Sequence, residues 1–452
     1  MIDPATPLLT DLYQLNMSQA YLDHGRIKTA VFELFVRKLP ASRTFLMAAG
    51  LQQALEFLEN LKFSSDDIDW LRQTGRFGDR LLDYLAALHF TGDVHALPEG
   101  TVFFGNEPIL RVTAPMPQAQ LAETRLMNIV NFQSMIASKA AHAKLVAPEK
   151  LLVDFGLRRA HGSEAGLMAA RASYIAGFAG TATVLAEKLF GIPTFGTMAH
   201  SFIESYDYES AAFEDFAVSR PQNLTFLIDT YDTEAAAKKV VALAPRLKAR
   251  GITIRSVRLD SGDLLKLSKS VRQILDDGGL QSVTIFASGG LDETSVAQLL
   301  DAGAPIDGFG IGTSLTTSSD APSLDCAYKL QEYDGLPRRK LSSGKATWPG
   351  RKQVWRQYGP DGVMTGDILS VEDDRQSGEP LLQLVMRNGR RVAPAPTLVE
   401  IRQRAAHNLA SLPTSLRRPK DDKGYDVKVA GPLTRLAAEV DRRLAQVLKA
   451  QA

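Results

Sequence analysis

The chain has 452 residues, of which 45% are hydrophobic, and it is therefore long enough for two or three domains with sizeable cores. Its 52 basic and 51 acidic side chains nearly cancel, which excludes a net field that would recruit nucleic acid or an anionic membrane surface. Residues 1–10 lack the basic and apolar runs of a signal peptide, and charged residues interrupt the most apolar long stretch, 167–189. The single cysteine, Cys326, suits a reducing compartment. We therefore expect a cytoplasmic protein with no membrane span and no nucleic-acid partner.

The first part of the chain mixes helical and extended patterns. Apolar residues recur at helical spacing over 51–61, whereas 30–35 and 101–112 have the pattern of strands. These patterns predict an N-terminal α+β domain over residues 1–135.

From residue 151 onward, short apolar runs alternate with helical patterns. The runs are 151–155, 194–197, 225–229, 252–259, 283–287 and 306–311, and the helical patterns include 234–250, 264–276 and 293–302. Continuously apolar strands separated by helices predict a parallel sheet that is buried on both faces. Six units are fewer than the eight of a regular barrel, so we expect an irregular or incomplete α/β barrel over residues 136–330. An open doubly wound sheet is the alternative.

After about residue 330 the sequence becomes charged and rich in glycine, which indicates hairpins, and it ends in helical patterns such as 433–449. We expect a small C-terminal region over 331–452. Its basic residues are more typical of a solvated face than of a nucleic-acid site.

Polar residues follow each apolar run of the expected barrel, where catalytic groups lie in barrel enzymes. Those with a side chain suited to binding or chemistry are Asp154, Arg158, Thr197, His200, Asp229, Asp232, Arg258, Asp260 and Asp263. The last two runs end in glycine turns at Gly289–Gly290 and Gly310–Gly312, and Thr313 adds a hydroxyl. Glycine turns before helices expose backbone N–H groups, which predicts a phosphate site, although tight turns alone would also require these glycines.

Two groups of these residues suggest particular chemistry. Arg258, Asp260 and Asp263 combine a cation with two acids, which suits an anionic substrate and either a developing positive charge or Mg²⁺. A surface ion-pair network is the plainer interpretation. An imidazole at His200 suits an acid, base or nucleophile, with a structural role as the alternative, and His161 is a weaker candidate. The sequence contains no P-loop, no Gly-x-Ser-x-Gly elbow and no histidine pair with metal-ligand spacing.

Several long motifs in one order resemble the nicotinate phosphoribosyltransferase family. They are Thr10-Asp-Leu-Tyr13-Gln-Leu, Phe32-Glu-Leu-Phe-Val-Arg37-Lys38-Leu-Pro, Asp154-Phe155-Gly-Leu-Arg158-Arg159-Ala-His-Gly, Gly196-Thr197-Met-Ala-His200-Ser, Val257-Arg258-Leu-Asp260-Ser-Gly-Asp263 and Gly310-Ile-Gly312-Thr313-Ser. The resemblance extends from about residue 8 to residue 355 and is less distinct after about residue 359.

The resemblance implies the type II phosphoribosyltransferase fold and a homodimer with shared active sites, in which Tyr13 reaches the partner's site. It implies that Tyr13 and Phe155 sandwich the pyridine ring and that Arg258 pairs with the nicotinate carboxylate beside Thr197. Phosphate groups would be held by a third set of residues: Arg37, Lys38, Arg158, Gly289, Gly290, Gly312 and Thr313.

The resemblance also implies a mechanism. The enzyme would join nicotinate to phosphoribosyl pyrophosphate in NAD salvage, and ATP would phosphorylate His200 to drive the transfer. Asp260 would stabilise an oxocarbenium-like transition state, and Mg²⁺ would neutralise the departing pyrophosphate. The acids Asp229, Asp232 and Asp263, together with Asp260, are the candidates for holding that metal.

Rival functions remain open from the sequence. The nicotinamide-using relative carries an aspartate where this chain has Ala182, and a carboxylate there would repel an acid substrate, so Ala182 favours nicotinate. A quinolinate-using enzyme would need more cations for its second carboxylate. A sugar-phosphate lyase or isomerase on a barrel and a catalytically silent binding protein are the alternatives from other classes.

Overall fold

The computed structural model describes residues 6–342, 346–418 and 424–451, so half of the N-terminal stretch 1–10 lies outside the described residues. The chain forms two compact units, Met1–Ser138 with Ser323–Ala452, and Lys139–Pro322. Residues 331–452, which we expected as a separate region, fall in the first unit. The reason is strand pairing, because β17 (Gln383–Arg387) pairs with the N-terminal strand β3 (Asp93–Ala96).

The first unit is built around a seven-stranded sheet in the order β13-β12-β1-β5-β3-β17-β18, and every neighbouring pair in it is antiparallel. Its other strands are β1 (Thr29–Val36), β5 (Pro108–Pro115), β12 (Cys326–Tyr333), β13 (Leu336–Pro337) and β18 (Arg390–Arg391). A short pair, β2 (Leu46–Met47) and β4 (Val102–Phe103), lies in the same unit. The mixed patterns of the first 135 residues thus correspond to an α+β arrangement.

A second sheet of this unit has the order β16-β14-β15-β19, formed by β14 (Lys352–Tyr358), β15 (Met364–Val371), β16 (Glu379–Pro380) and β19 (Val427–Val429). The helices of the unit are α1 (Leu12–Asp23), α2 (Leu51–Glu59), α3 (Ser65–Gln73), α4 (Asp79–Ala86), α5 (Met116–Leu121), α15 (Leu398–Ala410), η2 (Thr414–Leu416) and α16 (Gly431–Gln451). Helix α6 (Glu123–Val146) begins in this unit and ends in the second.

A buried charge network stabilises this unit between its strands. Arg356 donates two hydrogen bonds to Asp367, and both side chains are fully buried. Tyr425 also donates to Asp367 at 2.9 Å, and Glu107 lies in the same network. Burial and the negative charge of Asp367 raise the pKa of Glu107 well above its ordinary value, despite the positive charge of Arg356.

The second unit contains a six-stranded, entirely parallel sheet in the order β7-β6-β11-β10-β9-β8. Its strands are β6 (Leu151–Asp154), β7 (Gly180–Thr181), β8 (Leu224–Leu227), β9 (Ile254–Leu259), β10 (Thr284–Ala287) and β11 (Gly308–Ile311). Among the described residues, β7 and β8 do not pair with each other, so the sheet is a half-barrel. The prediction of an irregular, incomplete α/β barrel is confirmed.

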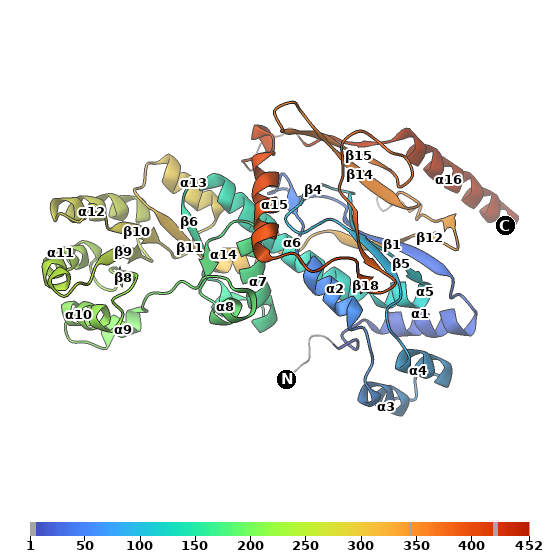
Figure 1. The fold of residues 1–452 in the computed structure, drawn as a ribbon, viewed down its shortest axis with the longest axis horizontal. Coiled ribbons are helices and arrows are strands. Elements are labelled where there is room, and N and C mark those ends of the chain that lie inside the picture. The colour runs from blue at the N-terminus through green and yellow to red at the C-terminus, as the bar shows by residue number, and fades with distance from the viewer. Residues whose placement is uncertain (1–5, 343–345, 419–423, 452) are drawn as a thin grey trace. The chain divides into compact units, whose positions relative to one another are not determined.

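Helices follow the strands of this sheet in the expected alternation, and α11 and α12 lie side by side (Figure 1). The helices are η1 (Leu157–Arg159), α7 (Ser163–Ile175), α8 (Val184–Phe190), α9 (His200–Glu204), α10 (Glu209–Ser219), α11 (Thr233–Ala249), α12 (Leu264–Asp277), α13 (Glu293–Asp301) and α14 (Thr313–Thr316). Side chains at helical spacing, such as Val271 and Leu275 of α12, are fully buried.

One expected strand was wrong. Residues 194–197 form only an isolated bridge from Thr194 to Thr181, and the sixth strand of the sheet is β7 instead. The segment instead lies close against β7, since a Cβ on Gly180 would lie 2.1 Å from the carbonyl oxygen of Pro193. The apolar stretch 167–189 is divided among α7, β7 and α8, and no described helix is long and apolar enough to cross a membrane.

Candidate active site

The side chain of Arg258 lies at the carboxyl end of β9 and is held by three neighbours. Its Nε donates to the Ser288 hydroxyl at 2.8 Å, Nη1 donates to Thr197 Oγ1 at 3.3 Å, and Nη2 donates to Asp260 Oδ1 at 2.8 Å. The Arg258 side chain is only 12% exposed. Parallel strands bring their carboxyl ends to one edge, so residues far apart in the sequence converge on one cation.

Asp260 is the acid at the centre of this cluster. Its Oδ1 accepts hydrogen bonds from Ser288 and Arg258, and its Oδ2 lies 3.7 Å from Nε2 of His200. Partial burial alone would raise the pKa of Asp260, but the Ser288 hydrogen bond and the Arg258 charge outweigh burial and hold that pKa below its ordinary value. Asp260 is therefore a carboxylate at neutral pH, and it lies beside both Arg258 and His200.

His200 is the first residue of α9, directly after the loop that carries Thr197. Its Nδ1 is 3.1 Å from the Thr230 hydroxyl, and its side chain is 39% exposed. One ring nitrogen thus contacts Thr230 and the other faces Asp260, and the side chain remains accessible to solvent. This arrangement suits a histidine that reacts with an external group.

Phe155 follows β6, and its ring packs closely against Gly310 of β11. A Cβ on Gly310 would lie 2.6 Å from the Phe155 ring, and Arg258 Cζ lies 5.3 Å from the ring centroid. Phe286 packs at 5.7 Å between ring centroids. The ring therefore has a fixed position next to the guanidinium, as an aromatic platform beside a cation requires.

The two glycine turns lie at the ends of β10 and β11. Gly289 has φ +91°, and a Cβ there would lie 1.8 Å from the carbonyl oxygen of Asp260, so this position accepts glycine only. Gly290 has φ +65° with open space where a Cβ would be, and Gly312 immediately precedes α14, whose first residue is the exposed Thr313. The two turns follow adjacent strands of the sheet.

The acids considered as metal ligands separate into two kinds. Asp232 and Asp263 are the N-cap residues of α11 and α12 and accept hydrogen bonds from Ala235 N and Lys266 N, at 2.7 and 3.0 Å. Asp229 instead accepts from the backbone N–H of Asp260 and the Ser261 hydroxyl through Oδ2, while its Oδ1 is buried without a hydrogen-bond partner in the described part of the chain.

The second unit does not contain every predicted site residue. Tyr13 on α1, with 47% exposure, and Arg37 and Lys38 after β1 belong to the first unit. Arg37 forms an ion pair with Asp325 at 2.9 Å, and Lys38 is exposed. Arg158, in the second unit, is exposed on η1 after Phe155.

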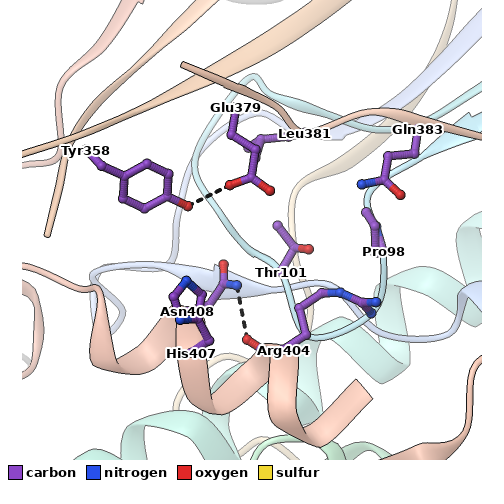
Figure 2. A pocket seen from close by; sticks show the side chains of 9 residues that line it. All are labelled: Pro98, Thr101, Tyr358, Glu379, Leu381, Gln383, Arg404, His407 and Asn408. Carbon is purple, nitrogen blue, oxygen red and sulfur yellow. Dashed lines mark hydrogen bonds between the residues drawn. The ribbon is translucent and has the colours of Figure 1, made fainter. Parts of the chain in front are cut away.

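A polar hollow of about 120 Å³ lies elsewhere in the first unit, and Figure 2 shows its lining. The Tyr358 hydroxyl donates to Glu379 at 2.9 Å, and Arg404 donates to the carbonyl oxygen of Glu99 at 3.0 Å. These polar side chains are therefore already paired, and the volume corresponds to room for several water molecules. None of the site residues predicted from the sequence lines this hollow.

Sequence reasoning gave no role to three residues that shape the cluster. Ser288 bridges Arg258 and Asp260, Thr230 contacts His200, and Thr181 donates to the buried carboxylate of Asp154 at 2.7 Å. Thr181 ends β7, Ser288 directly follows β10, and Thr230 lies in the loop three residues after β8. That position was an available signal, but hydroxyl residues at strand ends are too common for it to single them out.

The fold and site define the class of protein: an α/β-barrel enzyme whose functional groups gather at the carboxyl ends of its parallel strands. Family models then match three parts of the chain. The nicotinate phosphoribosyltransferase N-terminal domain matches residues 8–131, the nicotinate phosphoribosyltransferase family matches 151–334, and the C-terminal domain of that name matches 374–437. The chain belongs to the nicotinate phosphoribosyltransferase family.

Individual relatives agree with this assignment. A Mycobacterium tuberculosis protein named nicotinate phosphoribosyltransferase pncB2 is 51% identical over 94% of this chain and 91% of its own length. The Bacillus subtilis nicotinate phosphoribosyltransferase is 41% identical over 84% and 79% of the two chains. Among solved structures, human nicotinic acid phosphoribosyltransferase is similar with a TM-score of 0.84 and 30% identity, covering 95% of this chain and 99% of that one.

Proposed function

We propose that the protein transfers the phosphoribosyl group of phosphoribosyl pyrophosphate to nicotinate, forming nicotinate mononucleotide and pyrophosphate in NAD salvage, with ATP as a co-substrate. The observation that carries the proposal is the fixed guanidinium of Arg258 beside the Phe155 ring, 5.3 Å from its centroid. A flat ring that bears one carboxylate matches an aromatic platform with an adjacent cation.

The acceptor would bind with its carboxylate towards Arg258 and Thr197 and its ring on Phe155. The three hydrogen bonds that hold the guanidinium reduce the side-chain entropy lost on binding. Ala182, directly after β7, stands where the nicotinamide-using relative has an aspartate, so this position carries no charge here. An acid substrate is thus favoured over its amide, because no carboxylate stands there to accept from an NH₂ group.

In the transfer, the lone pair of the pyridine nitrogen forms the bond to ribose C1, and the bond from C1 to the pyrophosphate oxygen breaks. The departing pyrophosphate takes that electron pair. Asp260, a carboxylate at neutral pH, would stabilise positive charge on the ribose ring in the transition state. The N–H groups around Gly289, Gly290 and Gly312, with Thr313, would hold the ribose phosphate, and Arg158, Arg37 and Lys38 would bind other phosphate oxygens.

ATP would phosphorylate His200, so that ADP leaves as the bond between a ring nitrogen and the γ-phosphorus forms. Hydrolysis of the phosphohistidine then returns the imidazole and releases inorganic phosphate. The added negative charge beside Asp260 and Arg258 would alter the affinities for substrate and product, which couples hydrolysis to transfer. The 39% exposure of His200 gives the γ-phosphate access.

One feature of the described residues fits Mg²⁺. Asp229 has a buried carboxylate oxygen without a hydrogen-bond partner there, and such an oxygen can bind a metal ion. No group of three or more His, Cys, Asp or Glu residues suited to a metal ion occurs in the part of the chain that the structure describes. Mg²⁺ is commonly held by one or two carboxylates with substrate phosphates, so Asp229 would hold it together with pyrophosphate. When bound, the ion supplies charge neutralisation of the leaving group.

We further propose a cytoplasmic homodimer in which Tyr13 of one protomer completes the site of the other. Mixing two variants that are each expected to lack ATP-stimulated activity tests this. Tyr13→Ala and His200→Ala chains, once exchanged into hybrid dimers, would form one site with both residues intact. ATP-stimulated activity should return to about one quarter of the wild-type value in an equal mixture, since half the dimers are hybrids with one intact site in two. No recovery in exchanged hybrids would contradict shared sites.

Mononucleotide formation by the purified protein tests the function as a whole. Nicotinate, nicotinamide or quinolinate would be offered with phosphoribosyl pyrophosphate and Mg²⁺, each with and without ATP. ATP-stimulated product from nicotinate alone supports the proposal. Product from another acceptor would contradict the assignment of nicotinate as the substrate. No product from any acceptor would contradict the proposed activity and favour a sugar-phosphate enzyme or a silent binding protein.

A further inference from the structure

We propose that Asp154 is a positioning residue of the acceptor site, which fixes the Phe155 ring and the Ala182 position through one buried carboxylate. The inference rests on the proposed function, since it concerns how nicotinate is held. Asp154 ends β6 and is 1% exposed.

The carboxylate binds both sides of the acceptor site. Its Oδ1 accepts from the backbone N–H of Gly156 at 2.8 Å, which closes a turn around Phe155. Its Oδ2 accepts from the hydroxyl of Thr181 on β7 at 2.7 Å, and its backbone carbonyl accepts from the N–H of Ala182 at 2.8 Å. One residue thus joins the segment that bears the aromatic platform to the segment that bears Ala182.

The hydrogen-bond directions match the ionised form of Asp154. Thr181 Oγ1 accepts from the backbone N–H of Thr183 at 3.0 Å, so its own proton is directed to Asp154. Gly156 N–H can only donate. Both carboxylate oxygens therefore face donors, and an asparagine would place its NH₂ group against one of them. A buried donor left without a partner is costly, so one of the two segments would shift.

The turn around Phe155 has little freedom to absorb such a shift. A Cβ on Gly156 would lie 2.6 Å from Cβ of Thr316, and the Phe155 N–H donates to the carbonyl oxygen of Ile311 at 3.0 Å. The ring also packs closely against Gly310, where a Cβ would lie 2.6 Å from it. A displaced turn therefore moves the ring away from its position beside Arg258, which is the contact that the acceptor needs.

The groups that face the carboxylate are neutral, namely the Thr181 hydroxyl on β7, the Gly156 N–H in the turn and the Thr316 side chain packed against that turn from α14. Burial raises the pKa of Asp154 to about 6, although the hydrogen bonds from Thr181 and Gly156 oppose this rise. Nicotinate binding should therefore weaken as pH falls below about 6, where the carboxylate gains a proton.

The test compares Asp154→Asn with Asp215→Asn, an exposed aspartate on α10 of the same unit. We expect Asp154→Asn to raise the KM for nicotinate about tenfold, with the KM for phosphoribosyl pyrophosphate nearly unchanged, because one buried donor loses its acceptor. The rise in nicotinate KM between pH 6.5 and 5.5, relative to the control, should also disappear in this variant.

Two variants of the partner keep the test decisive if Asp154→Asn does not fold. Thr181→Ser keeps the hydroxyl and should retain the wild-type KM for nicotinate, whereas Thr181→Val removes the donor and should raise it. Wild-type protein that does not use nicotinate would contradict the proposed function. Wild-type protein that uses nicotinate, with unchanged KM in Asp154→Asn or Thr181→Val, would overturn the role of Asp154 alone.

Discussion

Arg258 donates to the carboxylate of Asp260 at 2.8 Å, and the two residues are separated by only one position at the end of β9. Residues i and i+2 of an extended segment point to the same side, which places a cation for the acceptor and an anion for the ribose together. Ser288 donates to the same oxygen of Asp260 and accepts from Arg258, so the neighbouring strand fixes both groups.

Replacing Arg258 by Lys should raise the KM for nicotinate by about 10- to 100-fold, because lysine keeps the charge but loses the planar fork that three neighbours hold. Initial rates over a range of nicotinate concentrations provide the measurement. Arg255→Lys, an exposed position on the same strand, is the matched control and should leave KM unchanged. An unaltered KM in Arg258→Lys would remove this residue from the acceptor site.

His200→Ala should abolish the stimulation of transfer by ATP while leaving some ATP-independent transfer. The variant should also take up no acid-labile label from γ-³²P-ATP, since no ring nitrogen remains to accept the phosphoryl group. His161→Ala, a residue without an assigned role, is the control and should label as the wild type does. Persistent label in His200→Ala would place the phosphorylated residue elsewhere.

Ala182→Asp should lower kcat/KM for nicotinate by at least about tenfold, because a carboxylate at this exposed strand end repels an acid substrate. The ratio of nicotinate to nicotinamide use measures the effect. Ala182→Asn has a similar size without the charge and separates repulsion from steric hindrance. If the two variants have the same ratio, charge at this position does not set the preference.

Replacing Arg356 by Met should lower the free energy of unfolding by about 3–5 kcal/mol, because the fully buried Asp367 would lose its paired cation. The loss should appear as a lower urea midpoint. Arg387→Met, at an exposed position of β17, should change the midpoint little. Equal midpoints in the two variants would show that the buried pair contributes no net stability.

The free energy of unfolding should also depend on pH through Asp154. Its folded-state pKa is raised from 3.8 to about 6, so between these values the folded protein binds more protons than the unfolded chain. This contribution to stability is therefore present below pH 4 and is lost as pH rises through 6, by roughly 3 kcal/mol in total. Urea titrations across pH 4–7 should show a flatter dependence for Asp154→Asn than for Asp215→Asn. Parallel curves would contradict the raised pKa.

Much of the second unit could be predicted from local patterns. Continuously apolar runs such as 252–259 correspond to β9, and the helical pattern 264–276 corresponds to α12, because burial on both faces of a sheet and on one face of a helix leaves a periodic signature. The strand expected at 194–197 was wrong, since a short apolar run alone does not specify which segment pairs at a sheet edge.

The sequence by itself determined the family, the barrel class and the positions of Arg258 and Asp260 at the end of β9, because each of these depends on local patterns or contiguous motifs. Only the tertiary structure decided that Ser288 bridges Arg258 and Asp260, that Asp229 keeps a free oxygen, and that β17 pairs with β3. Those outcomes depend on which strands become neighbours, and strand pairing between distant segments leaves no signal in the residues around either one.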